Sequence, residues 1–339
     1  MTIPTPKKAF IAGLAGLEVS PDERAFFHSE RPWGFILFSR NCETAEQIKD
    51  LVQDLKELGG SESVPVFIDQ EGGRVQRLRP PLAPSYPPGA AYGALYERNP
   101  EAGLEAVWLG GRLIACDLAK LGINADCLPV LDIPVEGAHD VIGDRAYGTD
   151  PDIVSILARK AGEGLLAGGI LPVIKHIPGH GRAGADSHLE LPRVSTSLEE
   201  LRKTDLAPFS SLRDFPMAMT AHVVYEAIDP KRPASTSDTV IGNIIRTDIG
   251  FDGLLMSDDV SMNALHGEIG ERSRACFAAG CDIVLHCNGK MHEMQAVADV
   301  APVLEGRALE RANETLGCLK APDPFNEADA RHRFENLFS

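Results

Sequence analysis

The sequence has no segment that is basic or apolar enough to suggest a nucleic acid or a membrane as its partner. Its 33 lysines and arginines are outnumbered by 49 acidic residues, which gives a net charge of −16, and they form no block. Binding of a nucleic acid requires a basic patch. No apolar run approaches the roughly 20 residues of a membrane-spanning helix, and the first ten residues do not look like a signal peptide. We therefore expect a cytoplasmic protein with no nucleic-acid partner and no membrane insertion.

Cysteine and histidine spacings typical of metal or redox sites are also missing. The seven cysteines are an odd number, and no two of them form a C-x-x-C motif. His176 and His180 are four residues apart, a spacing found in zinc-binding helices, but Pro178 and Gly179 between them disfavour a helix. We therefore expect reduced thiols, no metal and no cofactor.

What the sequence does contain is a recurrent pattern of short apolar runs. Continuous rather than alternating apolarity is typical of strands in a parallel sheet that is covered on both faces. The eight predicted strands are Ala9 to Ala12, Gly34 to Phe38, Val64 to Ile68, Leu128 to Leu131, Ile170 to Ile174, Met217 to Ala221, Gly253 to Ser257 and Asp282 to Leu285.

Helical patterns separate these runs. The clearest covers Thr44 to Leu58, where Thr44 and Gln47 resemble a capping box and Gly59 and Gly60 end the pattern. Further helices are predicted after Ser197 and over Arg272 to Ala279. Eight strands with helices between them predict an α/β fold, a single-domain TIM (β/α)₈ barrel.

A doubly wound sheet is the alternative fold, but it normally has fewer strands and a glycine-rich phosphate-binding loop near its start. No linker, low-complexity tract or internal repeat divides residues 1–339. We therefore expect one domain, with residues 321–339 forming a helical extension at its end.

Polar side chains follow several of the predicted strands. The carboxyl ends of barrel strands meet at one face, so residues that follow different strands should converge there. Asp69 follows the third strand, Asp132 the fourth and Asp258 the seventh, and the fifth leads into the loop KHIPGHGRAGADSHLELP at Lys175 to Pro192. Carboxylates, cations and histidines together fit hydrolytic transfer at a polar, uncharged substrate such as a sugar.

Five motifs lie at these strand ends: DQEGGRVQR at 69–77, IGDR at 142–145, KHIPGHG at 175–181, DSH at 186–188 and FDGLLMSDDVSM at 251–262. Their sequence and order resemble those of bacterial family 3 glycoside hydrolases, most closely the single-domain β-N-acetylglucosaminidases of cell-wall recycling. The resemblance implies a TIM barrel without a second domain. It also implies release of terminal, non-reducing, β-linked N-acetylglucosamine from muropeptides that end in 1,6-anhydro-N-acetylmuramic acid.

The resemblance further implies a role for each matching residue. Asp258 would be the nucleophile of a retaining mechanism, and His188 the acid/base with Asp186 as its partner. The sugar would be held by Asp69, Arg77, Arg145, Lys175 and His176. One departure from the family is at Arg182 and Ala183, where many relatives have Asp-Thr, and we expect it to affect the loop and its leaving-group contacts rather than the reaction.

Other chemistries stay open on the sequence alone. The acetamido carbonyl of the substrate can replace a protein nucleophile, but this route normally needs a paired acid and assistant. Asp259 should face away from Asp258 because consecutive strand residues point to opposite sides. Transfer of the sugar to phosphate would use the same intermediate, and an amino-sugar-binding protein without catalysis would use the same fold.

Simpler structural roles are also open for some residues. Arg77 and Arg145 could pair only with nearby acids such as Glu71 and Asp144, and Lys175 could form an ion pair at the barrel rim. The sequence predicts structural roles for His222, His266 and His286. A monomer that acts on a small saccharide is the expected form of the protein.

Overall fold

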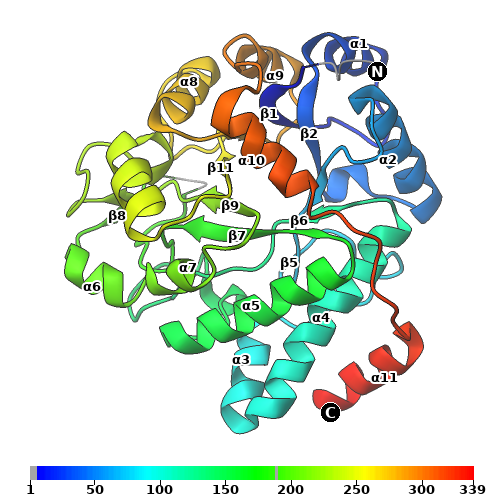
Figure 1. Cartoon of the computed structure of the whole chain (residues 1–339), viewed down its shortest axis with the longest axis vertical. Helices are drawn as coiled ribbons and strands as arrows, with labels where there is room; N and C mark the ends of the chain where they lie inside the picture. The colour runs from blue at the N-terminus through cyan, green and yellow to red at the C-terminus, as the bar shows by residue number, and fades with distance from the viewer. Residues whose placement is uncertain (1–5, 188–189) are drawn as a thin grey trace.

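The computed structural model describes residues 6–187 and 190–339. Its centre is a closed barrel of parallel strands in the order β1-β12-β11-β9-β7-β6-β3-β2, with helices around it (Figure 1). The barrel strands are β1 (Lys8–Gly13), β2 (Pro32–Leu37), β3 (Val66–Ile68), β6 (Ala125–Asp126), β7 (Leu171–Ile177), β9 (Met217–Thr220), β11 (Leu254–Asp259) and β12 (Ile283–His286). The predicted TIM barrel is confirmed.

Four short strands lie outside the barrel. β4 (Gln70–Gly72) and β5 (Val75–Gln76) form an antiparallel hairpin directly after β3, and β8 (Arg193–Val194) pairs with β10 (Val224–Tyr225). The 3₁₀ turns are η1 (Ser39–Asn41), η2 (Gly143–Arg145) and η3 (Ala234–Thr236). The β4–β5 hairpin and η2 extend from the carboxyl-terminal side of the barrel and carry residues of the site described below.

Helices cover the outside of the barrel (Figure 1). None in the described part of the chain combines the length and the apolarity needed to cross a membrane. They are α1 (Pro21–Glu30), α2 (Ala45–Gly59), α3 (Gly89–Arg98), α4 (Pro100–Lys120), α5 (Pro151–Ala167), α6 (Leu198–Lys203), α7 (Ala207–Ser211), the π-helix η4 (Val240–Asp248), α8 (Ile269–Ala279), α9 (Met291–Ala298), α10 (Gly306–Leu316) and α11 (Glu327–Leu337).

The predicted helix after Thr44 is confirmed as α2. The Thr44 side chain accepts a hydrogen bond from the Gln47 N–H, and Gly60 ends the helix in a left-handed conformation with φ of 71°. The Gln47 side chain accepts from the Glu43 N–H, one residue before the position expected in a capping box. Within the tail after residue 320, α11 packs on α4, where Arg331 binds Asp117.

The fourth predicted strand, Leu128 to Leu131, was wrong, because the strand that joins the barrel is β6. The predicted segment lies beyond β6 and still bonds to β7. The N–H groups of Val173 and Lys175 donate to the Leu128 and Pro129 carbonyls at 3.0 and 3.1 Å. Because Pro129 has no N–H group, it cannot return a hydrogen bond, and the regular ladder ends before it.

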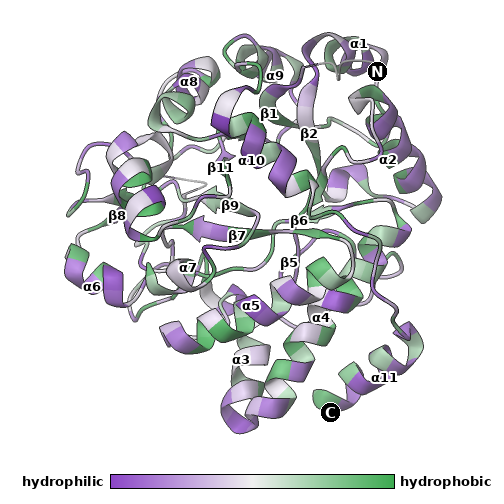
Figure 2. Cartoon of the chain, viewed as in Figure 1, coloured by the Kyte–Doolittle hydropathy of each residue, from purple (hydrophilic) through white to green (hydrophobic). Residues whose placement is uncertain are grey.

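The apolar core has two layers because strand residues alternate between the two faces of the barrel wall. Phe10 and Phe35 belong to the layer between strands and helices, whereas their neighbours Ile11 and Ile36 belong to the layer inside the barrel. All six residues of β2 are buried. Figure 2 shows the hydrophobic colour along much of the barrel strands, whereas the end of β7 is hydrophilic and the helices carry both colours. This two-sided burial explains why the strands are continuous apolar runs.

Candidate active site

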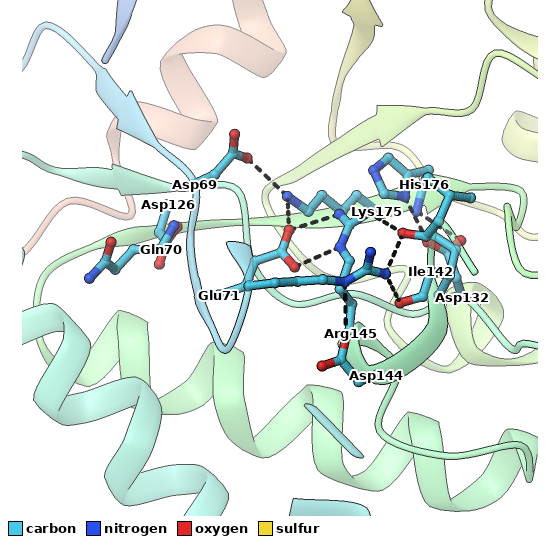
Figure 3. A network of polar contacts seen from close by, with 12 residues as sticks. Asp69, Gln70, Glu71, Asp126, Asp132, Ile142, Asp144, Arg145, Lys175 and His176 are labelled. Atoms are coloured by element: carbon cyan, nitrogen blue, oxygen red, sulfur yellow. Dashed lines mark hydrogen bonds and ion pairs between the residues drawn. The ribbon is translucent and has the colours of Figure 1, made fainter. Parts of the chain in front are cut away.

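A buried network of ions joins the ends of β3 and β7 (Figure 3). Lys175, on β7, lies with its ammonium 3.0 Å from Asp69 and 2.6 Å from Glu71. Arg145, in η2, binds Glu71 through both its Nε and Nη2 atoms, at 2.9 and 2.8 Å. Arg77 completes the network with a bond of 2.8 Å to Asp69. Residues far apart in the sequence therefore meet as one charged cluster.

Each ionised group in this cluster stabilises the charged form of its neighbours. Burial alone would raise the pKa of Asp69, but Lys175 and Arg77 hold it well below its ordinary value. Burial would lower the pKa of Lys175, but Asp69 and Glu71 raise it above 10.5. Near neutral pH the cluster therefore offers a carboxylate acceptor and several cationic donors, the groups that bind the hydroxyls of a sugar.

Asp132 organises the second half of the site. Its Oδ2 atom lies 2.6 Å from His176 Nδ1, and its Oδ1 atom accepts the backbone N–H groups of His176 and His180 at 3.2 and 2.6 Å. Burial would raise the pKa of Asp132, but His176 lowers it to about 2. The carboxylate thus fixes the orientation of the His176 ring and the start of the loop that follows it.

A cavity of about 150 Å³ lies between these groups and the end of β11. This volume is below the range of roughly 300 to 1,000 Å³ for drug-sized ligands, so the cavity suits one small unit. Six predicted site residues line it together: Asp69, Arg77, Arg145, Lys175, His176 and Asp258. Apolar walls come from residues such as Phe38, Met219 and Met262. An apolar lining with a few converging polar groups is typical of a binding site.

The two aspartates at the end of β11 have different surroundings. The Asp259 carboxylate accepts the Ser261 N–H at 3.0 Å, the Ser261 hydroxyl at 2.6 Å and the Cys287 N–H at 3.1 Å. These bonds fix the loops after β11 and β12. Asp258 and Asp259 both line the cavity, and these bonds commit the Asp259 carboxylate to the neighbouring loops.

The other two predicted catalytic residues lie in the loop after β7. His188 lies outside the described residues. Asp186 is half-buried, and its neighbour Ser187 lines the cavity. His180 Nε2 lies 3.0 Å from the Ser187 hydroxyl, and the Ser187 carbonyl accepts the Ala264 N–H. His180 and Ala264 thus hold the described part of this loop against the cavity wall.

Arg182, where the sequence departs from its family, lies outside the cavity wall. Its Nε atom donates to Asp205 at 2.6 Å and its Nη2 atom to Thr204 at 3.0 Å, both just beyond α6. Ala183, beside it, is buried. The departure therefore changes how the loop is anchored to α6.

Several site residues escaped the sequence reasoning. The sequence predicts Glu71 only as an ion-pair partner, yet it bridges Lys175 and Arg145. It predicts Phe38 as a strand residue, yet the Phe38 ring packs under the Arg77 guanidinium at 5.1 Å. Glu71 had a signal, since it lies in the 69–77 motif. Ser235 and the Asp259 carbonyl bind the ring nitrogens of His222, in agreement with the structural role that the sequence predicts for it.

His180 should make the fold sensitive to acid. Burial, and then the neighbouring His176, lower the pKa of His180 from 6.5 to about 4, whereas the unfolded chain takes up the proton near 6.5. Stability attributable to this residue is therefore lost as the pH falls from 6.5 to 4, by roughly 3 kcal/mol. We expect urea unfolding at pH 7 and at pH 4.5 to show a smaller difference for His180→Gln than for the wild type.

The control for that experiment is His332→Gln, since His332 is exposed on α11. Its substitution should leave the dependence of the unfolding free energy on pH unchanged. Equal pH dependence in wild type and His180→Gln would contradict the prediction, because His180 would then take up its proton equally in the folded and unfolded states.

Comparison with known proteins identifies the family of this barrel. The family model described as glycosyl hydrolase family 3 N terminal domain matches residues 17–314. The β-hexosaminidase of Alkalilimnicola ehrlichii is 41% identical over 280 residues, which are 81% of this chain and 79% of that protein. The β-hexosaminidase of Bordetella avium is 36% identical and covers 97% of this chain and 94% of its own length.

A solved structure shares the whole fold. NagZ from Neisseria gonorrhoeae in complex with N-trifluoroacetyl-D-glucosamine aligns with a TM-score of 0.89 and 33% identity, over 99% of this chain and 100% of that one. Fold, family model and full-length relatives agree. The chain therefore belongs to the family 3 glycoside hydrolases, as a β-hexosaminidase.

Proposed function

We propose that this β-hexosaminidase removes terminal N-acetylglucosamine from muropeptides that end in 1,6-anhydro-N-acetylmuramic acid, as a cytoplasmic monomer in cell-wall recycling. The observation that carries the proposal is the placement of Asp258 in one small cavity with Asp69, Arg77 and Lys175. A carboxylate beside hydroxyl-binding groups is the arrangement that a retaining glycosidase needs. The N-acylated glucosamine bound by the gonococcal relative supports the type of sugar.

The reaction is a double displacement. In the first step Asp258 attacks the anomeric carbon, the bond to the leaving oxygen breaks, and His188 gives that oxygen a proton. In the second step His188 takes a proton from water, whose oxygen displaces Asp258 from the sugar. Asp186 orients the His188 imidazole and favours its protonated form during the first step.

The ion network keeps the sugar in place during both steps. Asp69 accepts hydrogen bonds from sugar hydroxyls, and Lys175, Arg77 and Arg145 donate to them with the N–H groups left free by their ion pairs. His176, held by Asp132, presents its other ring nitrogen to the same sugar. Because these residues are positioned by one another before substrate arrives, little ordering is required on binding.

Two measurements test the proposal. Incubation of the enzyme in phosphate-free buffer with the anhydro-disaccharide peptide should release free N-acetylglucosamine. Brief exposure to a slow fluorinated N-acetylglucosamine analogue, followed by peptide mapping, should place a covalent adduct on Asp258. Turnover only with phosphate and a sugar 1-phosphate product would identify a phosphorylase, binding without turnover would indicate a non-catalytic protein, and turnover without an adduct would favour the substrate-assisted route.

Loss of His188 should depend on the leaving group. His188→Ala removes the proton donor, so we expect kcat/KM to fall about 10³-fold for the natural fragment and far less for an activated aryl glycoside, whose leaving oxygen needs no proton. Steady-state kinetics with a series of aryl leaving groups checks this. Equal losses across the series would contradict the assignment of the acid.

Arg74 should affect substrate binding because it holds the loop at residues 140–144. Its Nη2 atom donates to the carbonyls of Asp140, Val141 and Ile142 at 2.6, 2.9 and 3.0 Å, and its Nε atom binds Asp144 at 2.9 Å. This loop leads directly into Arg145.

Arg74→Ala should therefore raise KM about tenfold with a smaller change in kcat, because weaker placement of Arg145 reduces binding in the ground and transition states alike. Arg74→Lys should recover only part of the loss, since one ammonium cannot reach all four acceptors. Arg98→Ala, an exposed change on α3, is the control. A KM like that of the wild type in Arg74→Ala would contradict this role.

A further inference from the structure

The opposite mouth of the barrel holds a larger cavity, of about 700 Å³. It is lined by residues at the starts of β1 and β2, at the carboxyl ends of α1 and α2, and on α10, which lies across the centre of the ring of strands in Figure 1. Active sites of TIM barrels lie at the carboxyl ends of the strands, so this cavity is separate from the catalytic one. Its volume is in the range of small-molecule sites.

The cavity has an apolar wall on the side of β2 and α10. Trp33 lies in its wall and is only 4% exposed, and Leu316 of α10 lies beside it. At its edge, Val303 and Leu309 are 47% and 40% exposed. These are two of the three large apolar side chains that are exposed in the described part of the chain, and the third is Ile156. Exposed apolar side chains gathered at a cavity mark a binding site.

Two cations lie at the same cavity. Lys7 donates to the Gly59 carbonyl at 2.5 Å and Arg31 to the His28 carbonyl at 3.4 Å, so each binds the carboxyl end of a helix. Within residues 6–187 and 190–339 neither has a carboxylate partner, and burial, together with repulsion by Arg31, lowers the pKa of Lys7. An ammonium has three donors and a guanidinium five, so both cations keep unused donors.

The charge around this cavity differs from that of the whole protein. The chain has a net charge of −16, yet among the described lining residues Glu57 is the one carboxylate beside Lys7 and Arg31. Helix capping accounts for one donor of each cation but not for the apolar cavity next to them. An acidic head group would give both cations the partner that they lack.

We propose that this cavity binds a small amphipathic anion, with its carboxylate or phosphate head between Lys7 and Arg31 and its apolar body against Trp33 and Leu309. Charge complementarity and the apolar lining select this occupant over a neutral or a purely ionic ligand. The proposal does not depend on the reaction at the other face.

Trp33 provides a direct probe of this site. The chain has two tryptophans, so Trp108→Phe, a change on α4, leaves Trp33 as its one tryptophan. Decanoate and decyl phosphate, each below its micelle concentration, should change the emission of Trp33 saturably, and calorimetry should give the same Kd. Decanamide, of equal length but neutral, should bind about tenfold more weakly or worse, and inorganic phosphate alone should not bind below about 1 mM. A preference between decanoate and decyl phosphate identifies the head group.

Variants then locate the ligand. Leu309→Glu and Lys7→Gln should each weaken decanoate at least about tenfold, whereas Ile156→Glu, the matched change at the exposed apolar residue outside the cavity, should not. Thermal unfolding verifies that each variant is folded, and Leu309→Glu alters only an exposed position. No saturable signal or heat, equal binding of decanamide, or equal binding by Leu309→Glu would overturn the proposal. A concentration-dependent dimer that Leu309→Glu abolishes would overturn it in favour of a second copy of the chain.

Discussion

Replacement of Asp258 with alanine is expected to lower kcat for release of N-acetylglucosamine by about 10⁴-fold or more while leaving the fold intact. The physical reason is that water must then attack the anomeric carbon directly, without the covalent intermediate that divides the reaction into two easier steps. Asp258 lines the cavity on β11, and Lys175 forms ion pairs with Asp69 and Glu71. Steady-state kinetics on an aryl β-N-acetylglucosaminide, with circular dichroism of each variant, measures the effect.

Azide separates a lost nucleophile from a damaged site. In Asp258→Ala, azide can enter the space of the missing carboxylate and attack the anomeric carbon of a substrate with an activated leaving group. The product would be the α-glycosyl azide, because a single displacement inverts a β-glycoside. Asp259→Asn is the informative contrast, since it disturbs the bonds to Ser261 and Cys287 and should lower activity without azide rescue. Activity of Asp258→Ala within tenfold of the wild type would favour the substrate-assisted route.

The barrel could be predicted from the sequence because its strands are buried on both faces. Phe35 and Ile36 are neighbours on β2, yet one packs under the helices and the other inside the barrel, so the strand reads as an uninterrupted apolar run. Only two residues of the fourth strand, β6, join the barrel. The stronger apolar signal came from Leu128 to Leu131 beyond it, where Pro129 prevents a regular ladder.

The convergence of several candidate residues on one cavity could be predicted, but not how their side chains pair. Barrel topology brings the ends of β3, β7 and β11 together, so Asp69, Lys175 and Asp258 were expected in one place. Lys175 contacts two carboxylates because the β4–β5 hairpin folds back over the end of β3. The spacing of residues in the sequence does not predict this fold of the hairpin. The sequence also does not predict the contacts of Asp126. Burial raises the pKa of this residue well above its ordinary value, and its carboxylate accepts the Gln70 N–H beneath the site.

The sharing of Lys175 leads to the second large expected effect, which is on stability. Lys175→Met keeps the buried length of the side chain but removes a charge-assisted hydrogen bond to Asp69 and an ion pair with Glu71, at a position that is 2% exposed. Arg77 and Arg145 continue to neutralise the two carboxylates. We therefore expect a loss of about 3 kcal/mol in the free energy of unfolding at pH 7, at the low end for a broken buried pair.

The pH dependence of this loss identifies its origin. The lowered pKa values of Asp69 and Glu71 mean that their contribution is present above about pH 4, their range in the unfolded chain, and disappears as the pH falls through their folded values. Lys175, whose pKa is raised, contributes fully below 10.5. Wild type and Lys175→Met should consequently differ by a constant amount between pH 5 and pH 9 and converge in stronger acid.

Urea unfolding across this pH range, with Lys160→Met as the control, checks the prediction. Lys160 pairs with Glu163 at 2.7 Å on α5, but both side chains are about 40% exposed, so its loss should change stability by less than about 0.5 kcal/mol. If Lys175→Met were as stable as the wild type, the gain from burying methionine would offset the lost ion pairs. The ammonium would then be explained by sugar binding alone, and the variant should still lose activity.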